Sequence, residues 1–236
     1  MKLHVLVKKE ELDRERLEGK VVLVVDVLFA TTSIATALAH GASEVVPTLD
    51  GDAARREAAR RTPGSFVLAG ELHADTLPGF VHPTPLALVE HGVAGKSLLY
   101  STTNGTVALA KAREAARVYA AALVNGEAVV ERVASLSRGE TVLVVCSGSA
   151  DALNLEDLYG AGYLVSLLAR GGRYELSDAA LTARLLHDRT DAQHCLSQGR
   201  IGRLMLERGL EREVAFAAQK GRFAVVPELS DGRLTA

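Results

Sequence analysis

Carboxylate side chains occur at three places where a metal and phosphate site could form. Asp26 directly follows the apolar run Val21–Val25, and Glu71 comes just after a second apolar run. Glu156 and Asp157 stand in the first turn of an expected helix, where the helix dipole alone would also favour acids. Hard cations such as Mg²⁺ prefer oxygen ligands and keep several waters. These four acids are therefore the candidate metal ligands, and Asp26 and Glu71 are also the candidate catalytic residues.

Hydroxyl groups follow two of the expected strands. The first cluster, Thr31-Thr32-Ser33, is expected in a loop before a helix that stops at Gly41. The second, Ser101-Thr102-Thr103-Asn104-Gly105-Thr106, precedes a helix that begins at Val107. Amide and hydroxyl donors at a helix N-terminus bind phosphate. The candidate substrate-binding residues are Thr31, Thr32, Thr102, Thr103, Asn104, Gly105 and Thr106.

Apolar runs that alternate with helical segments predict an α/β fold. We expect a single three-layer α/β/α domain over residues 1–236, with a mostly parallel or mixed sheet. Ligands bind at the carboxyl ends of strands in such sheets. Strands at Val21–Val25, Phe66–Ala69 and Ser97–Tyr100 are expected to be near neighbours that run the same way. Asp26 and Glu71 would then lie within about three strand spacings of about 4.8 Å each.

The C-terminal third of the chain is expected to be mostly helical. A helix over 178–187 is followed by a helix over 197–207 that ends at Gly209. Residues 223–227 read as a final strand because they are apolar and end at a proline. Residues 231–236 are then expected to form a polar tail.

Composition and charge argue against several classes of protein. The formal net charge of the 236-residue chain is −2, and its Lys and Arg residues are scattered, whereas a nucleic-acid surface needs a basic stripe. No apolar segment approaches the roughly 20 residues that span a bilayer, and the N-terminus lacks the features of a signal peptide. We therefore expect a cytoplasmic protein without a nucleic-acid or membrane partner. Cys146 and Cys195 have no metal-binding or redox spacing. Cys146 follows an expected strand, so it is expected to be a packed core thiol, with a nucleophile as the alternative.

The common nucleotide and hydrolase motifs are missing. No P-loop, dinucleotide fingerprint or Gly-x-Ser-x-Gly elbow follows any expected strand. The haloacid-dehalogenase phosphatases need a second Asp two residues after the first, and Leu28 occupies that place after Asp26.

Four segments together resemble the 2-phosphosulfolactate phosphatase family. The run from Asp26 to Thr32 resembles the first family signature, and Gly70-Glu71 keeps part of the second. The loop 101–106 is similar to the third signature, and the segment 154–162 is similar to the fourth. The resemblance covers most of the chain in family order.

This resemblance implies magnesium-dependent hydrolysis of 2-phospho-3-sulfolactate, a step towards coenzyme M or sulfolactate. The expected partner is a small phosphorylated organic acid, with a sulfonate group among the options, and a homodimer is one option for assembly. Two departures bear on the substrate, because Phe29 and Leu72 stand where that family usually has Arg. An Arg fork binds phosphate or sulfonate in a bidentate manner that neither residue can replace.

Two alternatives stay open at this point. The first is a catalytically degenerate protein that binds anions or senses metabolites. The second concerns mechanism: either an activated water attacks phosphorus, or Asp26 itself becomes phosphorylated.

Overall fold

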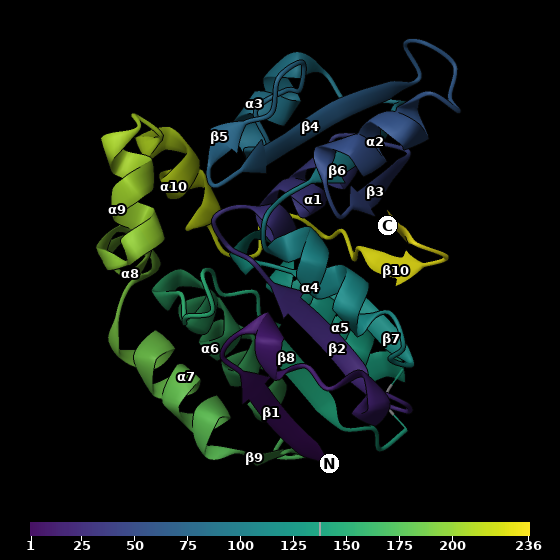
Figure 1. Cartoon of the computed structure of the whole chain (residues 1–236). Helices are drawn as coiled ribbons and strands as arrows, with labels where there is room; N and C mark the ends of the chain where they lie inside the picture. Colours follow the sequence, from purple (N-terminus) through teal and green to yellow (C-terminus); the bar gives the residue numbers. More distant parts are fainter. Residues whose placement is uncertain (137) are drawn as a thin grey trace.

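A computed structural model describes residues 1–136 and 138–236 of the chain (Figure 1). Its described strands form one mixed sheet in the order β5-β4-β6-β3-β11-β10-β7-β2-β8-β1-β9. The strands are β1 (Lys2–Leu6), β2 (Val21–Val25), β3 (Glu44–Thr48), β4 (Phe66–Leu72), β5 (Asp75–Thr76), β6 (Ser97–Ser101), β7 (Arg117–Ala121), β8 (Val142–Cys146), β9 (Glu175–Leu176), β10 (Glu228–Ser230) and β11 (Arg233–Thr235). The predicted α/β fold with a mixed sheet is confirmed.

Helices cover both faces of this sheet. The α-helices are α1 (Ala30–Ala39), α2 (Gly51–Ala58), α3 (Pro85–His91), α4 (Gly105–Ala112), α5 (Gly126–Leu136), α6 (Leu155–Ala169), α7 (Asp178–Arg189), α8 (Ala192–Gln198), α9 (Arg200–Glu207) and α10 (Glu211–Ala217). Short 3₁₀ helices span Lys9–Glu11, Arg14–Arg16 and Leu123–Asn125. None of the helices in these described residues is long and apolar enough to cross a membrane.

The sheet consists of two parallel blocks that a hairpin joins. One block is β4-β6-β3 and the other is β7-β2-β8-β1. The antiparallel pair β10 and β11 lies between them in the strand order, and Figure 1 shows β10 beside β7. The pairs β7–β10, β10–β11 and β11–β3 are all antiparallel. The strands of one block therefore run in the opposite direction to those of the other block within the sheet. The expectation that β2 and β4 are near neighbours running the same way is therefore wrong, because β6, β3, β11, β10 and β7 lie between them.

The sheet bends around two helices, and this brings the distant blocks together. Helix α4 packs against β2 and β3, and α1 packs against β7 and β3, so each helix touches both blocks. One core cluster accordingly joins Val24 of β2 and Ile34 of α1 to Leu98 of β6. The carboxyl ends of β2 and β4 therefore meet at one cavity, although five strands separate them in the sheet.

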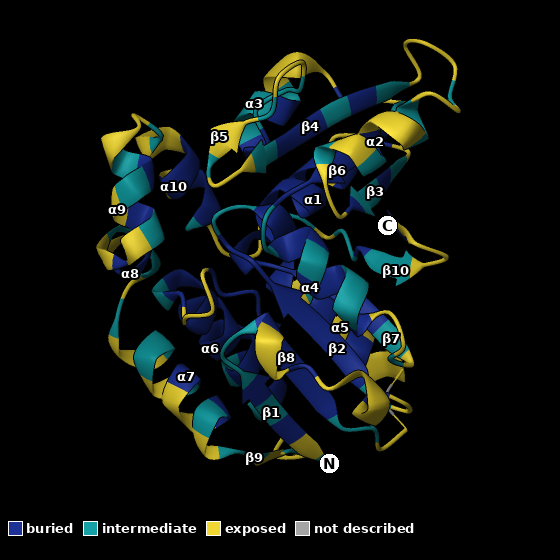
Figure 2. Ribbon diagram, viewed as in Figure 1, coloured by how far each residue is buried: buried dark blue, intermediate teal, exposed yellow. Residues whose placement is uncertain are grey.

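Strand β2 is the most deeply buried part of this frame. All five of its residues are buried, as the dark ribbon in Figure 2 shows. Helices α5, α6 and α7 pack against the outer face of the β7-β2-β8-β1 block, and α2 packs on β4 and β6. An uninterrupted run of apolar residues is typical of a strand that is covered on both faces.

The C-terminal region differs from the sequence expectation in two ways. The helix expected over 197–207 is divided into α8 and α9 by Gly199, whose backbone is extended at φ −62° and ψ 160°. The strand expected over 223–227 is wrong, and β10 and β11 form a hairpin where a polar tail was expected. Asp231 and Gly232 turn this hairpin with φ values of 49° and 76°. Asp-Gly is a strong hairpin signal, and Leu234 beyond it is fully buried opposite Val45.

Candidate active site

A cavity of about 460 Å³ lies where the carboxyl ends of the two blocks meet. Segments after β2, β4, β6 and β8 form most of its wall, and α9 closes one side. Its lining residues include polar, charged and apolar side chains from distant parts of the sequence. They are Lys9, Glu10, Asp26, Leu28, Phe29, Ala30, Glu71, His73, Ala74, His82, Pro83, Thr84, Tyr100, Thr102, Thr103, Asn104, Ser149, Ala150, Asp151, Asn154, Arg200, Ile201, Leu204 and Met205.

Asp26 lies at the centre of this arrangement, immediately after β2. Its Oδ1 accepts a hydrogen bond from the Ala30 amide at 3.2 Å. A Cβ on Gly105 would lie 2.7 Å from Oδ2 of Asp26, so the N-terminus of α4 can approach the carboxylate only because residue 105 is glycine. Burial raises the pKa of Asp26 to about 6; the Ala30 bond opposes the rise, and the charge of Glu71 adds to it.

Glu71 lines the same cavity, but hydrogen bonds occupy both of its carboxylate oxygens. Oε1 accepts the Thr103 amide at 2.6 Å. Oε2 accepts the Ala74 amide at 2.6 Å and the Thr103 hydroxyl at 3.1 Å. Glu71 therefore links the turn at the end of β4 to the loop after β6. Its carboxylate positions that loop.

Two tight turns beside the cavity carry residues in the left-handed backbone region. His73 and Ala74 have φ values of 54° and 67° in the turn between β4 and β5, and Ala150 and Asp151 have values of 51° and 56°. Such conformations cost non-glycine residues about 1–3 kcal/mol each and persist where the surroundings hold them. The bond from the Ala74 amide to Glu71 is one such restraint.

The loop 102–105 brings main-chain amides to the cavity. The amides of Asn104 and Gly105 donate to no protein acceptor within the described part of the chain. Thr102 and Thr106 hold the loop, since the Thr106 hydroxyl donates to the Thr102 carbonyl at 2.8 Å and the Thr106 amide donates to the Thr102 hydroxyl at 3.3 Å. The loop is thus a shaped group of donors at the start of α4.

The other predicted hydroxyl cluster lies outside the cavity lining. Thr31 and Thr32 are in the first turn of α1 rather than in a loop, and both are fully buried. The Thr31 hydroxyl donates to the Asp26 carbonyl at 2.9 Å and accepts the Asp26 amide at 3.0 Å. The Thr32 hydroxyl donates to the Val27 carbonyl at 2.8 Å. These two residues therefore support the backbone that carries Asp26.

Glu156 and Asp157 are buried behind Asp26 at the start of α6, with 1% of each exposed. Asp157 accepts the Val27 amide on Oδ1 at 2.9 Å and the Gly148 amide on Oδ2 at 3.1 Å. Oε2 of Glu156 is buried without a hydrogen-bond partner. Burial and the charge of Asp26 raise the pKa of Glu156 to about 7, and the same two causes raise that of Asp157.

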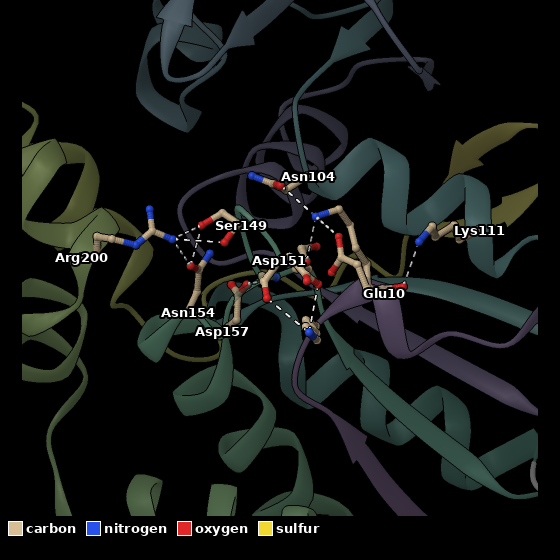
Figure 3. Close-up of polar contacts among 12 residues, drawn as sticks. Glu10, Asn104, Lys111, Ser149, Asp151, Asn154, Asp157 and Arg200 are labelled. Atoms are coloured by element: carbon tan, nitrogen blue, oxygen red, sulfur yellow. Dashed lines mark hydrogen bonds and ion pairs between the residues drawn. The ribbon is translucent and has the colours of Figure 1, made fainter.

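Two cations that belong to no sequence motif also line the cavity, Lys9 and Arg200. Lys9 is buried, with 6% of the residue exposed. Its amine donates to Asn104 Oδ1 at 2.9 Å and pairs with Glu10 at 3.0 Å. Arg200 reaches from α9 towards Ser149 and Asn154 in Figure 3, where its Nη2 lies 3.3 Å from Asn154 Oδ1. Leu72, by contrast, is 55% exposed and lies outside the lining, whereas Phe29 is part of it.

The donor set fits a hard divalent cation in part. Asp26 has one oxygen turned towards α4, and Glu156 has a buried oxygen without a partner. Burial and, to a smaller extent, the charges of neighbouring acids raise the pKa values of Asp26 and Glu156, and a nearby cation would favour their charged forms. Among the described residues, however, no three His, Cys, Asp or Glu side chains come together as a ready metal cluster. The oxygens of Glu71 and Asp157 already accept main-chain amides, so Asp26 is the lining acid that fits the cation best. Glu156 lies outside the lining, with its Oε2 towards Gly199.

Sequence signals for the missed residues are weak. Lys9 lies in a charged segment, and its burial depends on the Ser147 carbonyl and Asn104, which are far away in the sequence. Arg200 is one of several arginines in a helical region. Tyr100 ends an expected strand; its hydroxyl donates to the Pro83 carbonyl at 2.6 Å, and burial raises its pKa well above the ordinary value.

The fold and the site together define an α/β protein with a mixed sheet, whose cavity is lined by a buried acid, two cations and residues of the loop 102–105. The chain belongs to the 2-phosphosulpholactate phosphatase family, whose model matches residues 6–232. The resemblance found in the sequence is thereby confirmed.

Individual relatives support this assignment. A protein of Symbiobacterium thermophilum named probable 2-phosphosulfolactate phosphatase is 38% identical over 224 residues, covering 93% of this chain and 95% of that protein. Proteins with the same name from Carboxydothermus hydrogenoformans and Clostridium beijerinckii are 36% and 29% identical, covering 99% and 100% of this chain and 96% and 99% of theirs.

Proposed function

We propose that the chain is a magnesium-dependent phosphatase that hydrolyses the phosphate monoester of a small organic acid. The substrate is 2-phospho-3-sulfolactate, the compound in the names of the relatives, or a related small phosphorylated acid. The observation that carries this proposal is the placement of Asp26 against the N-terminus of α4, beside the loop 102–105 and Lys9.

The phosphate group would bind between that loop and Lys9. The Asn104 and Gly105 amides point from a helix N-terminus, where the helix dipole favours an anion. Lys9 supplies a full positive charge, and its bond to Asn104 holds it beside the loop. Glu71 supports this pocket from behind through Thr103.

Asp26 would hold the magnesium ion at the cavity, with Glu156 as the second acid behind it. When bound, magnesium would supply positive charge to the phosphoryl oxygens and lower the pKa of a water molecule. The reaction adds a water oxygen to phosphorus, breaks the ester P–O bond and returns the proton to the alcohol oxygen of the acid. The buried wall around Asp26 restricts solvent, and this strengthens each electrostatic contact to the phosphate.

Phosphate hydrolysis and its dependence on magnesium can both be tested on the purified protein. Phosphate release from 2-phospho-3-sulfolactate and from a panel of small phosphate esters is measured with magnesium and again with a chelator. Magnesium-dependent turnover of at least one ester is expected. Turnover of none would favour the catalytically degenerate anion-binding protein instead.

The route of hydrolysis has its own test. Mass analysis of the enzyme quenched during turnover would detect a phosphorylated peptide that contains Asp26 if the acid attacks phosphorus directly. We expect no such peptide, since water is the proposed nucleophile. The cytoplasmic location, the homodimer and the place of the reaction in coenzyme M or sulfolactate synthesis stay predictions.

A further inference from the structure

Arg200 is the first residue of α9, and its side chain lines the cavity. Gly199, which separates α8 from α9, places it there. A Cβ on Gly199 would lie 2.8 Å from Oε2 of Glu156, so the small residue lets the start of α9 pack closely on the start of α6. The point from which the Arg200 side chain reaches the cavity is therefore set by the backbone.

One nitrogen of the Arg200 guanidinium is already bound to the protein. Its Nη2 donates to the Ser149 hydroxyl oxygen at 2.5 Å and lies 3.3 Å from both the Ser149 carbonyl oxygen and Asn154 Oδ1. The Ser149 hydroxyl in turn donates to Asn154 Oδ1 at 2.7 Å. Within residues 1–136 and 138–236, Nη1 and Nε of Arg200 donate to no protein acceptor. Two donor nitrogens of a rigid cationic fork are thus left for a bound group.

The carboxylates around the cavity do not occupy these nitrogens. Four of them line it, on Glu10, Asp26, Glu71 and Asp151. Glu10 pairs with Lys9 at 3.0 Å, and Asp151 pairs with Lys8, which lies outside the lining, at 2.9 Å. Glu71 accepts main-chain amides, and Asp26 is the acid that would hold magnesium. In the part of the chain that the structure describes, Arg200 is the lining Lys or Arg without an ion pair.

Three other titratable groups leave the charge of Arg200 available. Glu156 lies behind the lining; burial raises its pKa, and the charge of Arg200 opposes the rise without an ion pair between these two described residues. His82 contacts the Thr84 hydroxyl at 3.1 Å, and burial holds its pKa below the ordinary 6.5, so the ring is neutral at pH 7. His73 also lines the cavity, and it is exposed to solvent.

The free nitrogens of Arg200 lie apart from the proposed phosphate position at the loop 102–105 and Lys9. Figure 3 shows the Arg200 guanidinium beside Ser149 and away from Asn104 of that loop. A guanidinium can bind a carboxylate or a sulfonate with two parallel hydrogen bonds. Small phosphorylated acids carry such a group next to the phosphate ester, so one molecule can reach both positions of the cavity.

We propose that Arg200 binds the second anionic group of the substrate, a carboxylate or a sulfonate, with Nη1 and Nε while Ser149 and Asn154 hold Nη2. It supplies a guanidinium fork that Phe29, where the family usually has Arg, cannot supply in the same cavity. The inference rests on the proposed phosphatase function and names the residue that recognises the acid part of the substrate. Arg200 contacts the substrate away from phosphorus and moves no proton.

The first experiment compares Arg200→Gln with wild type on three phosphate esters. These are 2-phospho-3-sulfolactate, which carries both acid groups, 2-phospholactate, which carries the carboxylate only, and propan-2-yl phosphate, which carries neither. For each ester with the recognised group, kcat/KM should fall at least about tenfold, mainly through KM, because hydrogen bonds between charged groups are lost. Loss for the sulfolactate ester alone identifies the sulfonate, and loss for both lactate esters identifies the carboxylate. An equal loss on all three esters, or no loss on any, would overturn the inference.

Two variants and one inhibitor serve as controls. Arg203→Gln lies on the same helix, exposed and outside the lining, and should leave all three values unchanged. Arg200→Lys keeps the charge without the fork, so it should show the same dependence on the ester if Arg200→Gln does not fold. Inhibition by inorganic phosphate should stay unchanged in both Arg200 variants. Weaker inhibition would show that Arg200 binds the phosphate group instead and would overturn the inference.

Binding of 3-sulfolactate, the proposed product, separates this inference from the phosphatase function because it needs no turnover. In titration calorimetry the dissociation constant should be at least about tenfold higher for Arg200→Gln than for wild type and Arg203→Gln. Equal dissociation constants, or no binding to wild type, would overturn the inference even if wild type hydrolyses esters. The expected difference in binding without hydrolysis of any ester would count against the phosphatase function alone.

Discussion

Oε1 of Glu71 accepts the main-chain amide of Thr103 at 2.6 Å, which links β4 to the loop that begins α4. With the bonds to the Thr103 hydroxyl and the Ala74 amide, this carboxylate fixes two segments of the cavity wall. The two strands that carry these segments, β4 and β6, are direct neighbours in the sheet. Asp26 comes from the other block, so the cavity depends on how the sheet bends.

Glu71→Gln should lower kcat/KM for phosphate esters by about 10- to 100-fold. The amide nitrogen of Gln cannot accept from Thr103 or Ala74, and a hydrogen bond to a charged group contributes about 1.5–3 kcal/mol. Because the loop loses its support, the loss should appear mainly in KM. Steady-state kinetics measure it, with Glu90→Gln as a control on the exposed side of α3. Equal kinetics for the two variants would contradict the positioning role.

Lys9→Met should raise KM by at least about tenfold, because it removes the cation beside Asn104 and keeps most of the side-chain volume. The matched control is Lys96→Met, whose amine donates to the Gly92 carbonyl at an exposed place. Inhibition by inorganic phosphate should weaken in parallel for Lys9→Met only. Unchanged phosphate inhibition would show that the anion binds elsewhere.

Uninterrupted apolar runs explain why much of the fold can be predicted from the sequence. Val21–Val25 and Val142–Cys146 form strands that are buried on both faces, and such strands have no polar alternation to obscure them. The hairpin of β10 and β11 has only three residues in each strand. It joins the two blocks by pairing with β7 and β3. No pattern in the neighbouring sequence predicts these long-range pairings.

The site was predictable to the extent that its groups lie at or beyond the carboxyl ends of strands. Asp26 and the loop 102–105 follow strands and Glu71 is among the last residues of β4, and all of them contribute to the cavity or its rim. Lys9 and Arg200 belong to no motif, and tertiary packing alone brings them to the cavity. The sequence predicts that the hydroxyls of Thr31 and Thr32 are available to a substrate. In the first turn of α1 they donate instead to the carbonyls of Asp26 and Val27.

Glu213→Gln should destabilise the protein by about 2–3 kcal/mol, since its buried carboxylate accepts three hydrogen bonds at the start of α3. The donors are the Thr84 hydroxyl at 2.6 Å and the amides of Leu86 and Ala87 at 2.9 and 3.2 Å. For a chain of this size the melting temperature should fall by about 4–10 °C. The exposed Glu211→Gln serves as control, and a melting temperature equal to the control would count against this anchor between α10 and α3.

The stability that Glu44 contributes should depend on acid pH. Burial alone would raise its pKa, but hydrogen bonds from Arg61 and Ser97 and the charges of Arg61 and Arg233 hold the pKa below the ordinary 4.5. A lowered pKa means that the contribution is fully present above about pH 4.5 and is lost as the pH falls through the folded-state value. Melting temperatures of wild type and Glu44→Gln should therefore differ at pH 7 and converge as the pH falls below the ordinary pKa of 4.5. A constant difference across this range would contradict the assignment.

We propose that Asp26 takes part in magnesium-dependent phosphate hydrolysis. The most direct test of this proposal is phosphate release by wild type, Asp26→Asn and the exposed control Asp52→Asn during a magnesium titration, with melting temperatures measured on the same samples. Saturable magnesium dependence is predicted for wild type and Asp52→Asn. Asp26→Asn should lose about 10³-fold in kcat while it stays folded. A folded Asp26→Asn with the rate and magnesium response of wild type would contradict the account.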